Sequence, residues 1–300
     1  MPVIFLFIDG VGLGDSKKAN PFADDRLKGF AAMAGGQSFV KESDEINSAN
    51  HLFKPVDATL GVKGLPQSGT GQATLFSGKN AAQEIGKHFG PYPHSGIKHL
   101  LRKPSLFQKA QQLQKSCNFI NGYPDSFFKY AQKRNRWTCT TLMTKSAGLP
   151  LNRVEDVKEG RALTAELTQQ AWREQLQIDV KEKTPEEAAM VIINQSVSND
   201  LVLHEYYLTD KAGHSQEMGK ARQFIGNYDR FLWFLICNKP KEVTIVLSSD
   251  HGNVEDLSTK THTFNKVPLF CLGPGANYFA EVESIQGVTP AIINYFRNKV

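Results

Sequence analysis

Three short apolar segments each run into an acidic residue, and this pattern constrains the fold more than any other feature of the chain. The segments are VIFLFI (3–8), DLVLHEYYL (200–208) and VTIVLSS (243–249), and the acids that follow them are Asp9, Asp210 and Asp250. Continuous runs of Val, Ile, Leu and Phe are typical of strands buried on both faces of a parallel sheet. Ligand sites of open α/β sheets gather at the carboxyl ends of the strands. We therefore expect the three acids to meet at one site.

Helical segments separate these strands. Helical spacing of apolar residues predicts helices over 105–115 and about 216–237, and CNFI (117–120) predicts a short strand after the first of them. A further helix is expected to start at Thr184, with Pro185 in its first turn and Glu187 closing a capping box. This alternation predicts an α/β fold with a doubly wound, mainly parallel sheet and helices on both faces.

The pattern weakens in the middle of the chain. We expect residues 1–123 and 184–300 to form one metal-binding core, and 124–183 to form a small inserted cap. A chain of 300 residues with 40% hydrophobic content is long enough to bury such a core.

Composition narrows the choice of compartment and partner. VIFLFI is too short to span a membrane and follows no basic segment, so a cytoplasmic protein without a membrane partner is expected. The four cysteines show no CxxC spacing, which indicates reduced thiols. The net charge of +5 is mild, and the one basic cluster, KRNR (133–136) beside Trp137, is interpreted as solvated surface rather than as a nucleic-acid site.

Acid and histidine residues recur in pairs with the spacing of metal ligands. TDKAGH holds two of them, SDHGN two more, and THTFNKVPL and DGVGLGD one each; in chain order the candidates are Asp9, Asp210, His214, Asp250, His251 and His262. Carboxylates and imidazoles are ligands for Zn²⁺ and Mn²⁺, and three of each are enough for two adjacent ions. Any single pair has an ordinary alternative: Asp210 could begin a helix, and Asp250 could cap a turn. Acids at three strand ends at once favour the metal site.

The stretch LPQSGTGQATLFSG (65–78) is a candidate phosphate loop, linker or nucleophile site. A Walker A loop does not fit, because Ala73 stands where its first glycine belongs and Asn80 where its Ser or Thr belongs. A dinucleotide fingerprint at 10–14 fails in the same way, since Asp15 stands in a glycine position. A flexible linker is disfavoured because the apolar residues after Gln72 can pack as one side of a helix.

Together, Asp9, the loop around Ser68, TDKAGH, SDHGN and HTFNKVP resemble the alkaline phosphatase superfamily. The closest branch contains cofactor-independent phosphoglycerate mutase and phosphopentomutase, and the resemblance covers roughly 1–85 and 200–275. It implies a doubly wound core, two divalent metal ions (Mn²⁺ or Zn²⁺) and a hydroxyl nucleophile. In the family the nucleophile precedes a glycine by ten positions. Ser68 stands in that relation to Gly78, and Thr70 is the second candidate.

The resemblance also implies roles for individual residues. The ligands of one metal are expected to be Asp9, Ser68, Asp250 and His251, and those of the other Asp210, His214 and His262. Gln72 replaces the histidine that is usual in the nucleophile loop. Substrate contacts are expected from Gly69, Thr70, Gln72, Lys87 and His88, and amides of 69–71 at a helix start could stabilise an anion.

The expected function is metal-dependent phosphoryl transfer on a small phosphorylated substrate. A phosphatase or phosphodiesterase acting through a phosphoserine is the first hypothesis. A phosphomutase is the alternative, and a non-catalytic binding protein on the same fold is a remote one.

Overall fold

A seven-stranded sheet forms the centre of the computed structural model, which describes residues 1–23 and 27–298. In the order β2-β3-β7-β6-β1-β5-β4, the strands are Ile46–Asn47, His51–Val56, Val267–Leu272, Thr244–Ser248, Val3–Ile8, Leu201–Tyr206 and Cys117–Phe119. Strands β6, β1, β5 and β4 are parallel neighbours. Strand β7 runs antiparallel to β6, and β3 runs antiparallel to β7, so β3 again shares the direction of the parallel group. The predicted mainly parallel sheet is confirmed.

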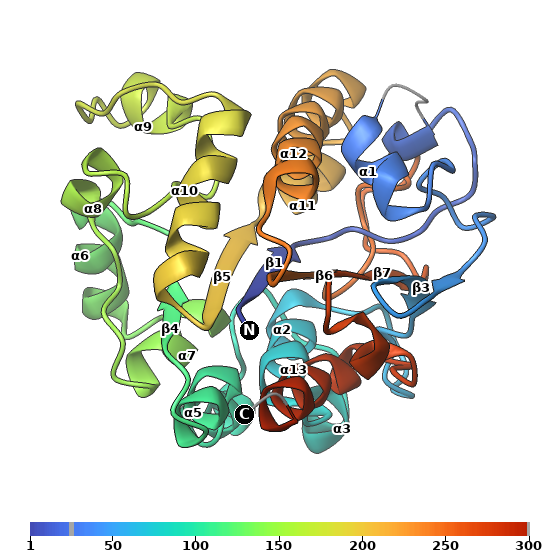
Figure 1. The fold of residues 1–300 in the computed structure, drawn as a ribbon, viewed down its shortest axis with the longest axis horizontal. Coiled ribbons are helices and arrows are strands. Elements are labelled where there is room, and N and C mark those ends of the chain that lie inside the picture. The colour runs from blue at the N-terminus through green and yellow to red at the C-terminus, as the bar shows by residue number, and fades with distance from the viewer. Residues whose placement is uncertain (24–26, 299–300) are drawn as a thin grey trace.

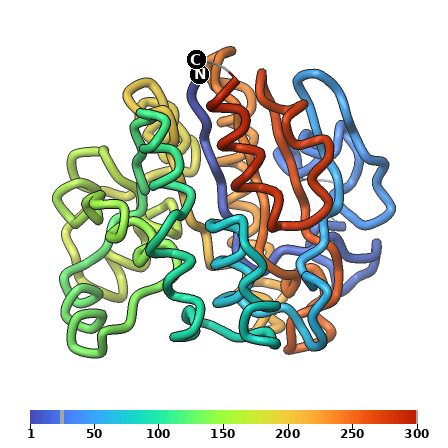
Figure 2. The backbone as a smooth tube through the Cα atoms, turned by 90° about the horizontal axis from the view of Figure 1, so that it is seen from below, coloured from blue at the N-terminus to red at the C-terminus, as the bar shows by residue number. Residues whose placement is uncertain are grey.

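Helices cover both faces of this sheet (Figure 1). One face carries α1 (Lys28–Met33), α10 (Pro185–Ser198), α11 (Leu208–Ser215) and α12 (Met218–Asn238). The other carries α2 (Ser68–Ser77), α3 (Ala81–Ile85), α4 (Lys98–Arg102), α5 (Leu106–Gln112), α7 (Cys139–Ser146) and α13 (Val288–Arg297). Beyond the β4 edge lie α6 (Asp125–Arg134), α8 (Val154–Lys158) and α9 (Gln170–Glu174). Short 3₁₀ helices span Pro21–Ala23, Ser95–Ile97, Ala276–Phe279 and Ile285–Gly287. Figure 2 shows the backbone from below, with β1 (dark blue) running through the middle of the molecule.

The position of β1 in the sheet explains why its sequence is apolar throughout. Its side chains alternate between the two faces, and each face is covered by helices. Phe7 points to the α2 side, where its ring meets the ring of Phe76 edge-on at 5.3 Å between centroids. Ile8 points to the opposite core. Because neither face meets water, no polar alternation appears in the sequence.

Most predicted elements occur close to their predicted places, and three strands (β2, β3 and β7) were missed. Helix α10 begins after Thr184, whose hydroxyl accepts from the Glu187 amide at 3.2 Å, while Glu187 Oε2 accepts from the Thr184 amide at 2.8 Å. This is the predicted capping box. Strands β3 and β7 were not predicted: β3 (HLFKPV) contains a lysine and a proline, which weaken a strand pattern, and β7 follows directly on the HTFNK motif.

The segment 124–183 is not uniformly separate from the core. Helix α7 packs on α2 and α4, and Met143 lies in the same apolar core as β1. A separate small cluster is formed by Val157, Ala162, Trp172 and Val180. The cap boundaries stay a prediction, and this cluster is the part of the segment with a core of its own.

The surface features expected from composition have plain structural counterparts. Among the described helices, none is both long and apolar enough to cross a bilayer. The four cysteines are free thiols. In the basic cluster, the Arg134 guanidinium lies over the Tyr130 ring and that of Arg136 lies over the Tyr92 ring, at 5.0 and 4.0 Å from the ring centroids.

We expect stability to fall in acid partly because of His204, which is fully buried in β5. Burial lowers the pKa of His204 from 6.5 to about 4, so between these values the unfolded chain binds a proton that the folded chain refuses. The contribution is complete above pH 6.5 and is lost as the pH falls toward 4, amounting to about 3 kcal/mol. Denaturant unfolding of metal-free protein at pH 7 and pH 4.5 measures it. The fall should be smaller in His204→Gln and unchanged in His99→Gln, at an exposed histidine.

Candidate metal centre

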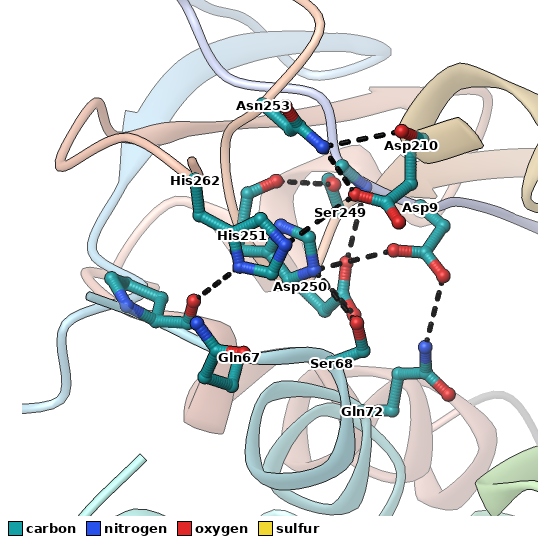
Figure 3. Close-up of polar contacts among 12 residues, drawn as sticks. Asp9, Gln67, Ser68, Gln72, Asp210, Ser249, Asp250, His251, Asn253 and His262 are labelled. Atoms are coloured by element: carbon teal, nitrogen blue, oxygen red, sulfur yellow. Dashed lines mark hydrogen bonds and ion pairs between the residues drawn. The ribbon is translucent and has the colours of Figure 1, made fainter. Parts of the chain in front are cut away.

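The three acids at the strand ends come together in the structure (Figure 3). Asp9 follows β1 directly, and Asp250 comes two residues after β6. Asp210 lies in the first turn of α11, which follows β5. Because β1 lies between β5 and β6 in the sheet, the carboxyl ends of these three strands are adjacent.

One group of ligand atoms gathers around Asp9, Asp250 and His251. Each side chain offers one atom, and these atoms all lie within 4.8 Å of one another. His251 Nε2 lies 3.4 Å from Asp9 Oδ1 and 3.6 Å from Asp250 Oδ2. Both carboxylate oxygens are buried and accept no hydrogen bond among the described residues. Ser68 Oγ lies 3.0 Å from the same His251 Nε2, so it joins this group.

A second group lies beside it, around Asp210 and His262. Asp210 Oδ1 is 3.6 Å from His262 Nε2, and His251 completes a set within 4.8 Å. His214 stands at the more exposed rim, with Nε2 3.4 Å from Asp210 Oδ2 and 3.3 Å from His262 Nε2. The resemblance gave His251 to the first group alone. In the structure its ring stacks on that of His262 at 3.8 Å and faces both groups.

All three histidines are oriented in the same way. The Nδ1 atoms of His251, His214 and His262 face the backbone carbonyls of Gly252, Lys260 and Pro66, at 3.3, 3.1 and 2.6 Å. An N–H at Nδ1 that donates to a carbonyl leaves the lone pair on Nε2, and Nε2 is the atom that faces the carboxylates. Metal-binding histidines are held by this kind of outer hydrogen bond.

The electrostatics of the centre favour a bound cation. Burial, followed by the charges of Asp250 and Asp210, raises the pKa of Asp9 well above its usual value. Burial likewise raises the pKa of Asp250. For Asp210 burial acts in the same direction, but the hydrogen bond with His214 and the charge of His251 outweigh it and lower the pKa. Burial, then the charge of His251, lowers the pKa of His262 to about 4.

The ion-pair partners of these acids, among the described residues, are histidines alone. Buried carboxylates with unpartnered oxygens, facing the Nε2 atoms of histidines, are the donor set of a divalent metal site. The residues present therefore fit the two metal ions that the sequence resemblance implies.

The structure distinguishes Ser68 from Thr70. Ser68 is the first residue of α2, and its hydroxyl points to His251. The Thr70 hydroxyl instead donates to the carbonyls of Gln67 and Phe89, at 3.1 and 3.4 Å, and accepts from the Phe89 amide at 3.2 Å. Thr70 holds the neighbouring loop, and of the two hydroxyls only that of Ser68 faces the acids and histidines.

The glycines after Ser68 make room for protein backbone. A Cβ on Gly71 would come within 2.6 Å of the Asp250 carbonyl oxygen, and one on Gly69 would overlap the carbonyl of Tyr92. The expectation that the 69–71 amides are available to an anion is not met at two of the three positions. The Thr70 amide already donates to Phe89 and the Gly71 amide to Gln67, both at 2.9 Å.

Of the remaining candidate substrate contacts, Gln72 forms a hydrogen bond with a proposed metal ligand. Gln72 Nε2 donates to Asp9 Oδ2 at 3.2 Å, so it touches the centre directly. His88 Nε2 faces the Val62 carbonyl at 3.3 Å, and the Lys87 ammonium lies 6.0 Å from the Phe89 ring centroid. A substrate role for Lys87 and His88 stays a prediction.

Sequence reasoning overlooked two residues beside the centre. Asn253 Nδ2 donates to Asp210 Oδ1 at 2.6 Å, and Asn253 stands in the SDHGN motif. Glu205, buried at the end of β5, accepts from the Thr140 hydroxyl at 2.7 Å, and burial raises its pKa to about 7. Its signal was a glutamate inside the mainly apolar strand sequence LVLHEY (201–206).

Comparisons with known proteins bear on this arrangement. Residues 168–300 match the family model described as the metalloenzyme superfamily. Over 112 residues the chain is 27% identical to the 2,3-bisphosphoglycerate-independent phosphoglycerate mutase of Mycoplasma pneumoniae, a match that covers 35% of this chain and 22% of that enzyme. The chain thus matches less than a quarter of the length of this curated relative.

Two solved structures share the fold over almost their whole length. The alkaline phosphatase of the Antarctic bacterium TAB5 aligns with a TM-score of 0.58 and 11% identity, over 99% of this chain and 97% of that one. The PH0037 protein of Pyrococcus horikoshii aligns with a TM-score of 0.59 and 11% identity, over 100% and 97%. The predicted resemblance to the alkaline phosphatase superfamily is confirmed.

Proposed function

We propose that this chain, which resembles the alkaline phosphatase superfamily in its motifs and fold, is a metal-dependent phosphoryl-transfer enzyme that hydrolyses phosphate esters. The proposal rests above all on the Ser68 hydroxyl, which lies 3.0 Å from His251 Nε2 at the start of a fully buried helix. Asp9 and Asp250 lie close to the same imidazole nitrogen, each with an oxygen that accepts no hydrogen bond among the described residues. A hydroxyl, two carboxylates and an imidazole gathered at one buried point suit a metal-activated nucleophile.

Two sets of side chains would hold the metal ions. Asp9, Ser68, Asp250 and His251 are proposed for one ion, and Asp210, His214 and His262 for the other, with His251 close to both groups. When bound, Mn²⁺ or Zn²⁺ supplies a lowered pKa for the nucleophile and neutralises charge on the transferred phosphoryl group. The substrate is proposed to be a small phosphorylated molecule.

Helix α2 positions the proposed nucleophile and one of the acids. Helix α2 fixes Ser68 at its first turn, so the side chain does not have to be ordered when the substrate arrives. Gln72 donates to Asp9 from one turn further along the same helix and holds that carboxylate in place. In the proposed reaction the Ser68 hydroxyl gives up its proton and its oxygen bonds to phosphorus as the bond to the leaving oxygen breaks, and the leaving oxygen takes up a proton to depart as an alcohol. Water then attacks the phosphoserine, and inorganic phosphate leaves as the serine is restored.

A substrate screen tests the proposal. Phosphomonoesters, phosphodiesters and sugar phosphates are each incubated with the protein and Mn²⁺ or Zn²⁺, and released phosphate is followed beside phosphoryl transfer within the substrate. We expect released phosphate, abolished by a chelator and restored by adding the metal back. Transfer without release would replace hydrolysis by the phosphomutase reaction. Metal-independent turnover would contradict the proposal.

A further inference from the structure

Glu255 is a buried carboxylate on which hydrogen-bond donors from three loops converge. Glu255 is only 1% exposed to solvent. Oε2 accepts from the amides of Gly12 and Asn253, at 2.8 and 2.7 Å. Oε1 accepts from Asn265 Nδ2 at 3.1 Å and from the Thr263 hydroxyl. Each oxygen therefore accepts two hydrogen bonds. Among the described residues Glu255 forms no ion pair.

Each donor belongs to a loop that carries proposed metal ligands. Gly12 comes three residues after Asp9, in DGVG. Asn253 comes two residues after His251, in SDHGN, and Thr263 follows His262 in HTFN. The backbone of the first two loops is tied together further, because the Val254 amide donates to the Gly10 carbonyl at 3.0 Å. Glu255 is the point at which all three loops are joined.

The glycines of these motifs fit closely around the same side chain. A Cβ on Gly12 would lie 2.7 Å from Glu255 Cδ, and one on Gly14 would lie 2.9 Å from Cγ. A Cβ on Gly252 would overlap both Glu255 Oε1 and the Thr263 hydroxyl. Glycine is needed at these positions because the backbone approaches the carboxylate too closely for any side chain. Gly12 and Gly14 of DGVGLG therefore pack around a glutamate of the protein itself.

We propose that Glu255 is a positioning residue that holds the ligand-bearing loops in register without binding a metal ion itself. The inference rests on the metal centre of the proposed function. An outer hydrogen-bonding residue fixes the directions of metal ligands, and losing one typically weakens metal affinity about 10- to 100-fold. A carboxylate suits this role because four donors need four acceptor sites, which an amide or an apolar side chain cannot offer.

The test compares Glu255→Met and Glu255→Gln with a matched control. Asp229 is also a buried carboxylate that accepts backbone amides from a distant segment, at Lys28, Gly29 and Phe30, but it fixes the start of α1. Asp229→Asn removes the charge there. Two readouts are taken: hydrogen exchange of the Gly12 and Asn253 amides in metal-free protein, and Mn²⁺ affinity by titration against a chelator.

We expect Glu255→Met to lose exchange protection at both amides and to bind Mn²⁺ about 10- to 100-fold more weakly. Glu255→Gln can keep its oxygen on the two amides but turns an NH₂ group toward Thr263 and Asn265, so its loss should be smaller. It also supplies the result if the methionine variant fails to fold. The Asp229→Asn control should melt lower and keep wild-type Mn²⁺ affinity.

The inference is overturned if the Glu255 variants keep both amides protected and bind Mn²⁺ as the wild type does. It is also overturned if the loss of affinity in them is matched by Asp229→Asn, since the effect would then be one of general stability. Failure of the proposed function looks different: the wild type itself would bind no Mn²⁺, while the exchange data would still report whether Glu255 orders the loops.

Discussion

Ser68→Ala should lower the turnover of phosphate esters by about 10³-fold or more while the protein keeps its fold and most of its metal. Removing a covalent nucleophile eliminates the reaction path itself, and comparable substitutions cost several orders of magnitude. The fold should survive because the lost oxygen has one polar partner among the described residues, His251. Initial rates at saturating substrate, with metal content measured on the same sample, give the result.

A second serine of the same helix provides the control. Ser77 is buried at the far end of α2, where its hydroxyl donates to the Ala73 carbonyl at 2.6 Å. Ser77→Ala should therefore cost some stability and leave turnover near the wild-type value. If Ser68→Ala retained full turnover, Ser68 would be the wrong residue, and Thr70→Val would decide whether the second hydroxyl acts instead.

Asp250→Asn should abolish tight metal binding and yet raise the melting temperature of the metal-free protein. The acids of the centre repel one another, and burial with this repulsion raises the pKa of Asp9 and of Asp250. A raised carboxyl pKa means that the folded state holds its proton more tightly than the unfolded state does. The contribution of Asp9 and Asp250 to the stability of the metal-free protein is therefore greatest in acid and falls as the pH rises above the ordinary carboxyl range. The asparagine variant should show a shallower fall.

Thermal unfolding in chelator and in Mn²⁺, over a range of pH, checks this prediction. Asp200→Asn is the control, because the hydrogen bonds from the Ser116 amide and hydroxyl outweigh burial and lower the pKa of Asp200. That substitution should lower the melting temperature and leave metal binding intact. If the metal-free Asp250→Asn protein melted at a lower temperature than the wild type, the expected destabilisation by repulsion among the buried acids would be wrong.

Strand ends and short motifs carried most of the information in the sequence. Strand β1 occupies 3–8 as predicted, because a strand buried on both faces needs an unbroken apolar run. The metal-ligand candidates could be named from SDHGN, TDKAGH and HTFN, since each motif holds its ligands within a few residues. What joins the motifs is tertiary, and no local pattern encodes it. The place of β3 beside β7, for example, depends on pairing between residues more than two hundred positions apart.

The parts of the site that sequence reasoning missed are those that depend on packing. A sequence cannot tell which hydroxyl of S-G-T-G faces the histidines, and in the structure the Thr70 hydroxyl bonds to the backbone of Gln67 and Phe89. The stretch 65–78 was a candidate phosphate loop, but in the structure Gly71 accommodates the backbone at Asp250. Glu255 lies two residues beyond SDHGN and has no ligand spacing of its own. Its role follows only from the loops that surround it.

The most direct test of the account is to identify the residue that becomes phosphorylated. Protein with Mn²⁺ is mixed briefly with an activated phosphomonoester, quenched in acid and digested, and the phosphopeptides are mapped by mass spectrometry. We predict one phosphoryl group on Ser68, absent in Ser68→Ala and in chelator-treated protein. Turnover with a phosphoryl group on another residue, or on none under conditions that trap a phosphoserine, would contradict it.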